Sequence, residues 1–460
     1  RDRVRAALSS MTIALPSKRI IINLSPADLP KEGSHFDLPI ALSLLAAIDI
    51  LPRDMVQTFV ALGELSLDGT LTPVLGALPA AMTAAEHHKG LLCPAACGAE
   101  AAWVGNTQVI AAACLRDVVH HCTGQTPLAA ATPGEAPLCA SQKDLQEVKG
   151  QERGKRALEI AAAGRHHLMF VGTPGSGKSM LAARLPTILP PLSPREALST
   201  SMIHSLAGLI DEGGISRHRP FREPHHTASM VAIIGGGRHA KPGEVSLAHN
   251  GVLFMDELPE FPRAVLETLR QPLESGEVTV ARANAHVKYP CKFMLVGAAN
   301  PCKCGHLNDA ARACSRAPKC GEDYMGRISG PLMDRFDMRV DIPPVAYTDL
   351  DLHDGGEASA AVAARVAMAV EKQASRFKSF PDVSQNADAD GTLLEEIATP
   401  DTEGRALLLH AAARFQLSAR GYHRVLRVAR TIADLDSSAG IRKPHVAEAL
   451  SFRLPQGTIA

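Results

Sequence analysis

The stretch VGTPGSGKS, from Val171 to Ser179, constrains the fold of this chain more than any other part of its sequence. It fits the pattern G-x-x-x-x-G-K-[ST], in which glycines let backbone N–H groups wrap phosphates. An apolar run, HHLMFVG, enters the stretch, and a helical pattern, KSMLAARLPTIL, leaves it. A strand, a phosphate loop and a helix in this order predict ATP bound at a parallel α/β sheet.

Each residue of this loop has an expected role. Lys178 would contact the β- and γ-phosphates, and the Ser179 hydroxyl would bind Mg²⁺. The alternative is a glycine-rich turn without a ligand. The residues predicted to hold the nucleotide are Gly172, Thr173, Pro174, Gly175, Ser176, Gly177, Lys178 and Ser179.

Polar residues end two later apolar strands. In GVLFMDE, Asp256 is expected to complete Mg²⁺ coordination, and Glu257 is expected to polarise the attacking water. The alternative is an acidic helix cap before Pro259. In LVGAANP, Asn300 is expected to orient the same water, although an isolated Asn before Pro301 also fits a plain turn.

Two arginine-containing segments follow. Arg335, in GPLMDRFD, is either half of a structural salt bridge or an arginine finger that acts on the nucleotide of a neighbouring subunit. The helix LSARGYHRVLRVARTIADL is basic, and one of its arginines is expected to reach the γ-phosphate while the others form a solvated face. These arginines are Arg420, Arg424, Arg427 and Arg430.

Composition limits the possible partners. The 460 residues carry no formal net charge, so a nucleic acid would need a local basic patch. No apolar run reaches the length of a membrane span, which excludes a membrane partner. Ten cysteines in so long a chain, beside a nucleotide motif, favour a reducing, cytoplasmic location. Because the chain starts at Arg1 rather than Met, we expect N-terminal residues to be missing.

The pattern along the chain predicts separate units. Residues 1–124 form a mixed α/β unit, with strands at RIIINLSPA and TFVALGEL and helices at DLPIALSLLAAI and ALPAAMTAAEHH. Residues 125–142, rich in Pro, Ala, Thr and Gly, form a linker. Residues 143–343 form the ATPase core, and residues 344–460 form an Ala-rich helical lid.

Taken in order, these elements resemble an AAA+ ATPase of the helix-2-insert clade, and more closely the ComM/YifB family of magnesium-chelatase-like ATPases. The strings that carry the resemblance cover nearly the whole chain. They are LPKEGSHFDLPIAL, RPFREPHHTAS, PGEVSLAHNGVLFMDELPEF, LRQPLESGEVTVAR, GAANPCKCG, RISGPLMDRFD and LSARGYHRVLRVARTIADL.

The resemblance implies particular roles and an assembly. Asp256 and Glu257 become the Walker B pair, and Asn300 becomes sensor 1. Arg335 becomes the finger. Arg420 becomes sensor 2, with Arg424 and Arg427 as rivals. Proteins of this kind are ring hexamers, and a finger in trans requires at least a dimer.

The N-terminal unit resembles the Lon-protease-type (S5-like) domain. LPKEGSHFDLPIA is similar to the stretch that holds the catalytic serine there, and GELSLDGTLTPVLGALPAA to the stretch that holds the lysine. Here His35 stands at the serine position and Leu78 at the lysine position, with Ser34 one residue away. Because a Ser-Lys dyad needs both groups, we expect this fold without protease chemistry.

Four cysteines, Cys302, Cys304, Cys314 and Cys320, lie between Asn300 and Arg335. Four thiolates suit tetrahedral Zn²⁺, although the spacing is not that of paired C-x₂-C knuckles. His306 is a possible substitute ligand. A loop of reduced thiols is the alternative.

Two excursions from the core are candidates for substrate contact. The segment 203–248 is basic and rich in histidine, and we expect its histidines to serve packing and hydrogen bonding. EVTVARANAHVKYP alternates on both sides of ARANA and predicts a β-hairpin. In the helicases that this core resembles, a basic residue at the hairpin tip lies in the ring pore against nucleic acid. Here these residues would be Arg282 and Lys288, and a solvated hairpin charge is the alternative.

The resulting hypothesis is an ATP-driven hexameric motor on single-stranded or branched DNA. The resemblance implies branch migration in recombination and natural transformation. One alternative is a magnesium-chelatase-type remodelling subunit, and a second is a Lon-like ATP-dependent protease, which His35 and Leu78 disfavour.

Overall fold

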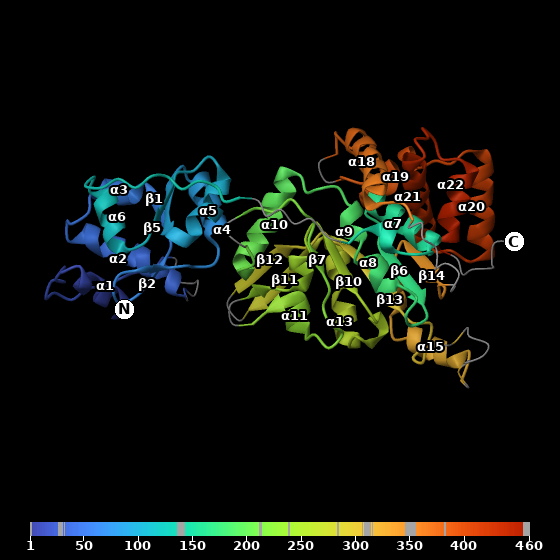
Figure 1. Ribbon diagram of the computed structural model, residues 1–460, viewed down its shortest axis with the longest axis horizontal. Helices are drawn as coiled ribbons and strands as arrows, with labels where there is room; N and C mark the ends of the chain where they lie inside the picture. The colour runs from blue at the N-terminus through green and yellow to red at the C-terminus, as the bar shows by residue number, and fades with distance from the viewer. Residues whose placement is uncertain are drawn as a thin grey trace.

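The computed structural model describes residues 2–25, 31, 33–135, 143–210, 214–237, 240–282, 285–305, 307, 314, 316–345, 356–380 and 383–453. In chain order it has an N-terminal α/β unit, a central unit built on a parallel sheet, and a C-terminal helical unit (Figure 1). Within these ranges, no helix is long and apolar enough to cross a membrane. The mixed α/β fold class predicted from the sequence is confirmed.

The N-terminal unit is a small parallel sheet with helices packed on it. Its three-stranded sheet has the order β1-β4-β5, and β2 and β3 form a separate antiparallel pair. The helices predicted at DLPIALSLLAAI and ALPAAMTAAEHH are confirmed as α2 and α4. The elements are α1 (Asp2–Ser10), α2 (Asp37–Ala47), α3 (Arg53–Gln57), β1 (Phe59–Ala61), β2 (Glu64–Leu65), β3 (Leu71–Thr72), α4 (Ala77–Glu86), β4 (Gly90–Pro94), α5 (Gly98–Ala101), β5 (Val109–Ala112) and α6 (Leu115–Cys122).

The prediction of a strand at RIIINLSPA is wrong for residues 19–25, the part of this string that the structure describes. Residues 19–24 have no regular secondary structure, and Ile20, Ile21 and Ile22 are exposed. Their β-branched side chains favour a strand, but a strand also needs a partner backbone, and none of the described strands pairs with this segment.

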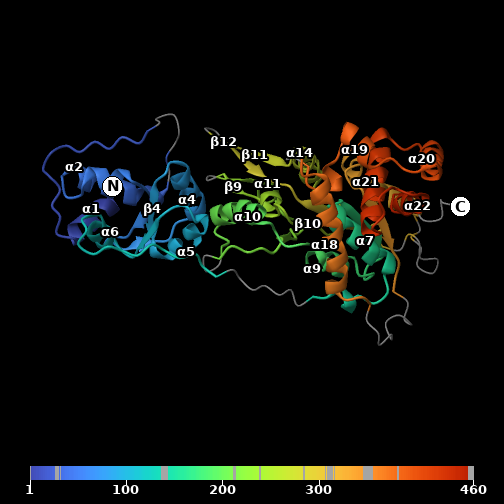
Figure 2. The ribbon, with the colours of Figure 1, turned by 90° about the horizontal axis from the view of Figure 1, so that it is seen from above.

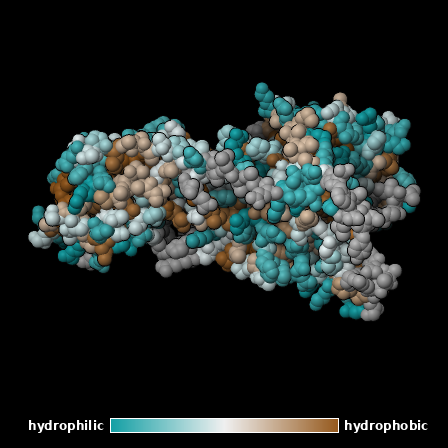
Figure 3. Space-filling model, viewed as in Figure 1, coloured by the Kyte–Doolittle hydropathy of each residue, from teal (hydrophilic) through white to brown (hydrophobic). Residues whose placement is uncertain are grey.

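In the space-filling view, hydrophobic surface gathers on the N-terminal unit more than on the central one (Figure 3).

The central unit contains a five-stranded sheet in the order β14-β6-β13-β10-β7, with every neighbouring pair parallel. Every residue of β10 and β13 is buried, as expected for parallel strands covered by helices on both faces. The carboxyl ends of β6, β10 and β13 therefore meet at one edge. The strands are β6 (Leu168–Gly172), β7 (Phe221–Arg222), β10 (Val252–Met255), β13 (Met294–Ala299) and β14 (Met338–Ile342).

Helices of up to 14 residues precede and connect these strands. The helix predicted after the phosphate loop is divided into α8 and α9, with Pro186 in the first turn of the second helix. The helices are α7 (Glu152–Gly164), α8 (Lys178–Ala182), α9 (Leu185–Ile188), α10 (Pro194–Ala207), α11 (Met230–Ile234), α12 (Glu244–Leu247), α13 (Arg263–Thr268), α14 (Arg270–Ser275), α15 (Lys319–Met325) and α16 (Gly330–Met333).

Two antiparallel hairpins stand apart from the main sheet. The predicted hairpin is confirmed as β11 (Glu277–Arg282) and β12 (Ala285–Pro290), and β8 (Gly235–Gly236) pairs with β9 (Lys241–Pro242) beside it. The Tyr289 hydroxyl donates a 2.8 Å hydrogen bond to the carbonyl oxygen of Ala240, which joins the two hairpins. Figure 2 shows β11 and β12 at the edge of the central unit that faces the N-terminal unit.

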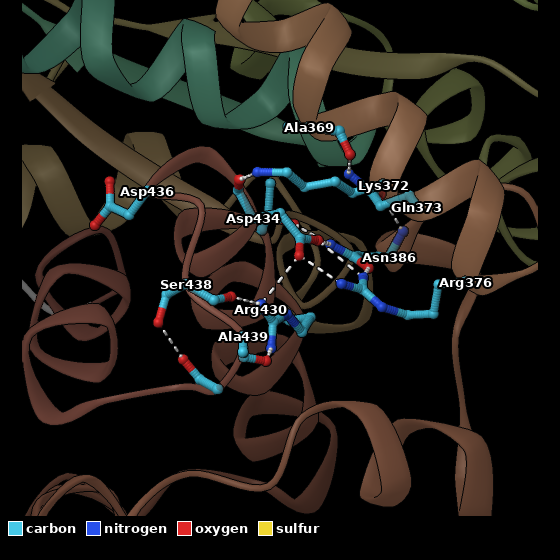
Figure 4. Close-up of polar contacts among 12 residues, drawn as sticks. Ala369, Lys372, Gln373, Arg376, Asn386, Arg430, Asp434, Asp436, Ser438 and Ala439 are labelled. Atoms are coloured by element: carbon cyan, nitrogen blue, oxygen red, sulfur yellow. Dashed lines mark hydrogen bonds and ion pairs between the residues drawn. The ribbon is translucent and has the colours of Figure 1, made fainter.

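The C-terminal unit is helical and shares one hydrophobic core with α7 and β6. Its helices are α18 (Ser359–Arg376), α19 (Gly391–Ile397), α20 (Thr402–Arg414), α21 (Ala419–Leu435) and α22 (Lys443–Ser451). A buried polar cluster fixes α18 against α21 (Figure 4). In it, the Asp434 carboxylate accepts hydrogen bonds from Arg376, Asn386 and Arg430, so its buried charge is fully partnered.

The N-terminal and central units meet at α4 and α10. Leu78 is fully buried in a cluster with Leu192, Ala197 and Ile215. Upstream of the central unit, the backbone N–H of Ala131 donates to the carbonyl oxygen of Val109, so this part of the 125–142 segment lies along the N-terminal unit.

Candidate nucleotide site

The phosphate loop joins β6 to α8 at the carboxyl edge of the sheet. Gly177 has a φ of 92°, a left-handed conformation that favours glycine, and it places Lys178 at the start of the helix. The Lys178 ammonium donates hydrogen bonds of 2.9 Å to the carbonyl oxygens of Gly172 and Thr173, and one of 3.2 Å to Oδ1 of Asn300. Lys178 of the loop and Asn300, the residue that follows β13, are thus brought together.

The acidic pair at the end of β10 lies beside the same loop. The Ser179 hydroxyl donates a 2.5 Å hydrogen bond to Oδ2 of Asp256, and the Glu257 backbone N–H donates to Oδ1 of Asp256 at 2.8 Å. Burial lowers the pKa of Lys178, and the charges of Asp256 and Glu257 oppose that shift. Two oxygens from different elements therefore converge next to a cation, an arrangement that can hold Mg²⁺ and phosphate.

A segment that the sequence analysis assigned to packing also reaches this edge. β7 pairs in parallel with β10, so the residues that follow it emerge beside Asp256. Nδ1 of His226 lies 3.5 Å from Oε2 of Glu257. The edge contains a cavity of about 290 Å³, lined by Glu223, Pro224, His225, His226, Asp256 and Glu257. The sequence gives only a weak signal for this contact, because the strand that places it, Phe221–Arg222, is two residues long.

Arg335 lies at the opposite edge of the sheet. It precedes β14, which runs parallel to β6, whereas Lys178 follows β6. The five residues of β6 separate the two edges by roughly 15 Å at about 3.3 Å per residue. Arg335 forms an ion pair with Glu274 and lines a cavity of about 430 Å³ at the amino ends of the strands.

Arg424 fixes the backbone beside Arg335. It donates a 2.8 Å hydrogen bond to the carbonyl oxygen of Arg335 and forms a buried ion pair with Asp337. Asp337 also accepts a 2.9 Å hydrogen bond from the backbone N–H of His167, the residue before β6. Burial raises the pKa of Asp337, but the charge of Arg424 and the contact with His166 outweigh it and hold that pKa far below its ordinary value.

The solvated face expected for the other lid arginines is wrong for Arg424 and Arg430, because both are buried. Arg427 donates to the carbonyl oxygen of Ala389 at 2.6 Å, and Arg430 belongs to the buried cluster of Figure 4. Arg420 is exposed. The pKa of Arg335 is lowered mainly by burial and secondly by the positive charge of Arg420. Arg420 therefore lies near Arg335, at the edge opposite Lys178.

Cysteine side chains from the loop after β13 and from α15 lie close together. The sulfur atoms of Cys302, Cys304 and Cys320 all lie within 4.8 Å of one another. A hydrogen bond with Cys314 is the main cause that raises the pKa of Cys320 to about 11, so the fourth thiol is adjacent. His306 lies outside the described residues. A Cβ on Gly305 would come within 2.5 Å of Pro174, so this cysteine loop packs against the phosphate loop.

The hairpin has one buried and one exposed face. Val278, Val280 and Tyr289 are buried, whereas Thr279 and Lys288 are exposed and face each other across the strands. The Arg282 backbone pairs with that of Ala285, but the Arg282 side chain lies outside the described part of the structure. Lys288 is therefore available on an open hairpin surface.

Comparison with protein families adds to this geometry. The chain matches the model "Magnesium chelatase, subunit ChlI" over residues 144–350, "Subunit ChlI of Mg-chelatase" over residues 1–97, and "Magnesium chelatase, subunit ChlI C-terminal" over residues 356–453. It is 43% identical to the "Competence protein ComM" of Haemophilus influenzae, over 98% of this chain and 89% of that protein. The chain belongs to the ComM/YifB family of magnesium-chelatase-like proteins.

Other relatives are similar over different lengths. The YifB protein of Escherichia coli is 42% identical over 98% of this chain and 88% of its own length. The magnesium-chelatase 38 kDa subunit of Rhodobacter capsulatus is 27% identical, over only 34% of this chain and 49% of that protein. Family membership supports an AAA+ P-loop core and a family-level ATPase role that uses ATP and Mg²⁺. The similarity of the N-terminal unit to the Lon-type domain stays a prediction.

Proposed function

We propose that this ComM/YifB protein is an ATP-hydrolysing motor that moves single-stranded or branched DNA through a ring of subunits. Branch migration of recombination intermediates during natural transformation is the setting that we infer. The relative named as a competence protein supports this, because it matches the chain over nearly its whole length. The individual chelatase subunit of Rhodobacter capsulatus matches only 34% of the chain, whereas the three chelatase-subunit family models cover most of it, so the remodelling role stays the alternative.

In the proposed cycle, the carboxyl edge of the sheet holds the nucleotide. The phosphate loop, from Gly172 to Ser179, wraps the phosphates. Lys178 contacts their charge, while Ser179 and Asp256 hold Mg²⁺. Glu257 takes the proton of the attacking water, and Asn300 orients that water.

The opposite edge serves the neighbouring subunit. The length of β6 separates Arg335 from the phosphate loop of the same subunit by roughly 15 Å. Arg335 is therefore better placed to contact the γ-phosphate bound by a neighbouring subunit. Arg420, exposed near Arg335, is proposed as a second cation that faces the same neighbouring nucleotide. This separation of the two edges is the observation that carries the proposal of a ring, for which a hexamer is the expected size.

The hairpin is the proposed DNA contact. It stands apart from the main sheet, and Lys288 is exposed on it. Cations there would bind backbone phosphates with little regard to sequence. We propose Arg282 and Lys288 as the residues that contact DNA.

The test compares ATP hydrolysis with and without four-way-junction DNA in wild-type, Arg282→Ala and Lys288→Ala proteins. Both variants should keep the basal rate and lose the stimulation by DNA. Lys443→Ala, which removes an exposed lysine of the lid, is the matched control and should be stimulated like wild type. Full stimulation of both hairpin variants would rule out the hairpin as the DNA contact.

Zn²⁺ is proposed to bind the cysteine loop in a structural role. Four sulfur donors suit a closed tetrahedral site, in which sulfur atoms lie about 3.8 Å apart. The sulfur atoms of Cys302, Cys304 and Cys320 lie within 4.8 Å of one another, and Cys314, which contacts Cys320, would move closer to the other two to act as the fourth ligand. Because the loop packs on Pro174, bound zinc would also support the phosphate loop.

A further inference from the structure

His226 occupies a particular position relative to the proposed base. In the parallel pair β7–β10, Phe221 aligns with Val252 and Arg222 with Leu253. The residues after β7 therefore run beside the last residues of β10 and reach the sheet edge where Asp256 and Glu257 lie. The contact of His226 with Glu257 thus follows from the sheet register rather than from an isolated side-chain conformation.

The His226 ring is held on several sides. Its centroid lies 4.2 Å from that of the His225 ring, and it meets the Phe261 ring edge-on at 6.5 Å. Phe261 is itself buried. The side chain of His226 is 33% exposed, so the ring lies at the cavity wall rather than free in solvent. A ring packed in this way can fix the orientation of a more exposed partner.

Glu257 is such a partner. Its backbone has a φ of 49°, and its N–H is held by Asp256, but its side chain is 50% exposed. The carboxylate therefore needs a contact that fixes its rotation. His226 supplies one from Nδ1 to Oε2 at 3.5 Å. Catalytic hydrogen bonds are often this long without substrate and shorten when the reacting complex forms.

We propose that His226 is a positioning residue for Glu257. Nδ1–H donates to Oε2 of the carboxylate, which leaves Oε1 to accept a proton from the water that attacks the γ-phosphate. The inference rests on the proposed ATPase function and deepens it. His225 does not share the role, because its Nδ1 lies 2.8 Å from Oγ1 of Thr227 instead.

Steady-state ATP hydrolysis tests the proposal in His226→Ala, His226→Asn and Glu257→Gln proteins. His226→Ala should lower kcat roughly ten- to hundredfold, with KM nearly unchanged, because a misplaced base slows the chemical step more than it weakens binding. Asn places its side-chain nitrogen where His has Nδ1, so His226→Asn should recover much of the lost kcat. His218→Ala, an exposed histidine of the same segment, is the matched control.

The outcomes separate this inference from the proposed function. If wild type hydrolyses ATP, Glu257→Gln does not, and His226→Ala matches wild type, the positioning role is wrong and the ATPase assignment stands. A loss of ATP affinity as large as the loss of kcat, with no recovery in His226→Asn, would show a structural role only and would also overturn the inference. A wild-type protein without ATP turnover would overturn both proposals.

Discussion

Oγ of Ser179 lies 2.5 Å from Oδ2 of Asp256, although the two residues belong to different elements of the sheet edge. Ser179 lies in α8 and Asp256 follows β10. Mg²⁺ in nucleotide sites takes one or two protein oxygens together with phosphate oxygens. The pair therefore marks the point at which the proposed ATP site brings the loop, the metal and the acidic strand end together.

Lys178→Ala should weaken ATP binding by at least about tenfold, because the ammonium next to the phosphates is removed. Equilibrium titration with a fluorescent ATP analogue measures this directly. Lys443→Ala should bind like wild type. Equal affinities in all three proteins would refute the nucleotide site.

Glu257→Gln should keep ATP binding and lose turnover by roughly 10²–10⁴-fold, because an amide cannot accept the proton of water. The same titration, paired with a phosphate-release assay, separates binding from chemistry. Turnover close to wild type would show that another group acts as the base.

Arg335→Ala should hydrolyse ATP poorly although its own phosphate loop is intact. When it is mixed with Lys178→Ala, some interfaces pair an intact nucleotide site with an intact finger, so part of the activity should return. Activity measured across mixing ratios tests this. Co-assembled mixtures without any recovered activity would argue that Arg335 does not act in trans.

Asp337→Asn should destabilise the contact between lid and core. Removing one partner leaves the Arg424 charge buried and unpaired, at a cost of about 3–5 kcal/mol. Because the pKa of Asp337 is lowered by folding, its contribution is present above the unfolded pKa of about 3.9 and is lost as the pH falls below it. The difference in thermal midpoint between wild type and Asp337→Asn should therefore narrow as the pH is lowered from about 5 to about 3. A gap that stays constant or widens would contradict this.

Cys302→Ser should lose bound zinc and lower the thermal midpoint, because three thiolates hold the metal less well than four. Metal analysis of purified protein should give one zinc per wild-type chain. Cys122→Ser, at a cysteine of the N-terminal unit, is the control and should keep the metal. A wild-type chain without zinc would leave the loop as reduced thiols.

The sequence predicted β6, β10 and β13, the three strands that lead to the ATP-site residues, because their signals are local, whereas β7 and β14 were not predicted. β10 and β13 are apolar runs directly followed by a polar residue, Asp256 after β10 and Asn300 after β13. Parallel strands bring those ends to one edge without further information. The hairpin could be predicted equally well, because the alternation of apolar and polar residues and the turn between the two strands lie within one short segment.

Other features depend on contacts that no local pattern encodes. The run at Ile20 has strand composition but no strand partner in the described structure. His226 reaches Glu257 only because β7, which is two residues long, lies beside β10. The surroundings of Arg420, Arg424 and Arg427 depend on how α21 packs against the core, so the sequence left these three as rivals.

The most direct test of the proposed motor is the ATPase rate of the wild-type protein without DNA and with single-stranded, duplex or four-way-junction DNA, at about 50 mM and about 200 mM salt. The account predicts several-fold stimulation that falls as salt rises, with junction DNA more effective than duplex. Intact basal turnover that no DNA stimulates at either salt concentration would contradict it.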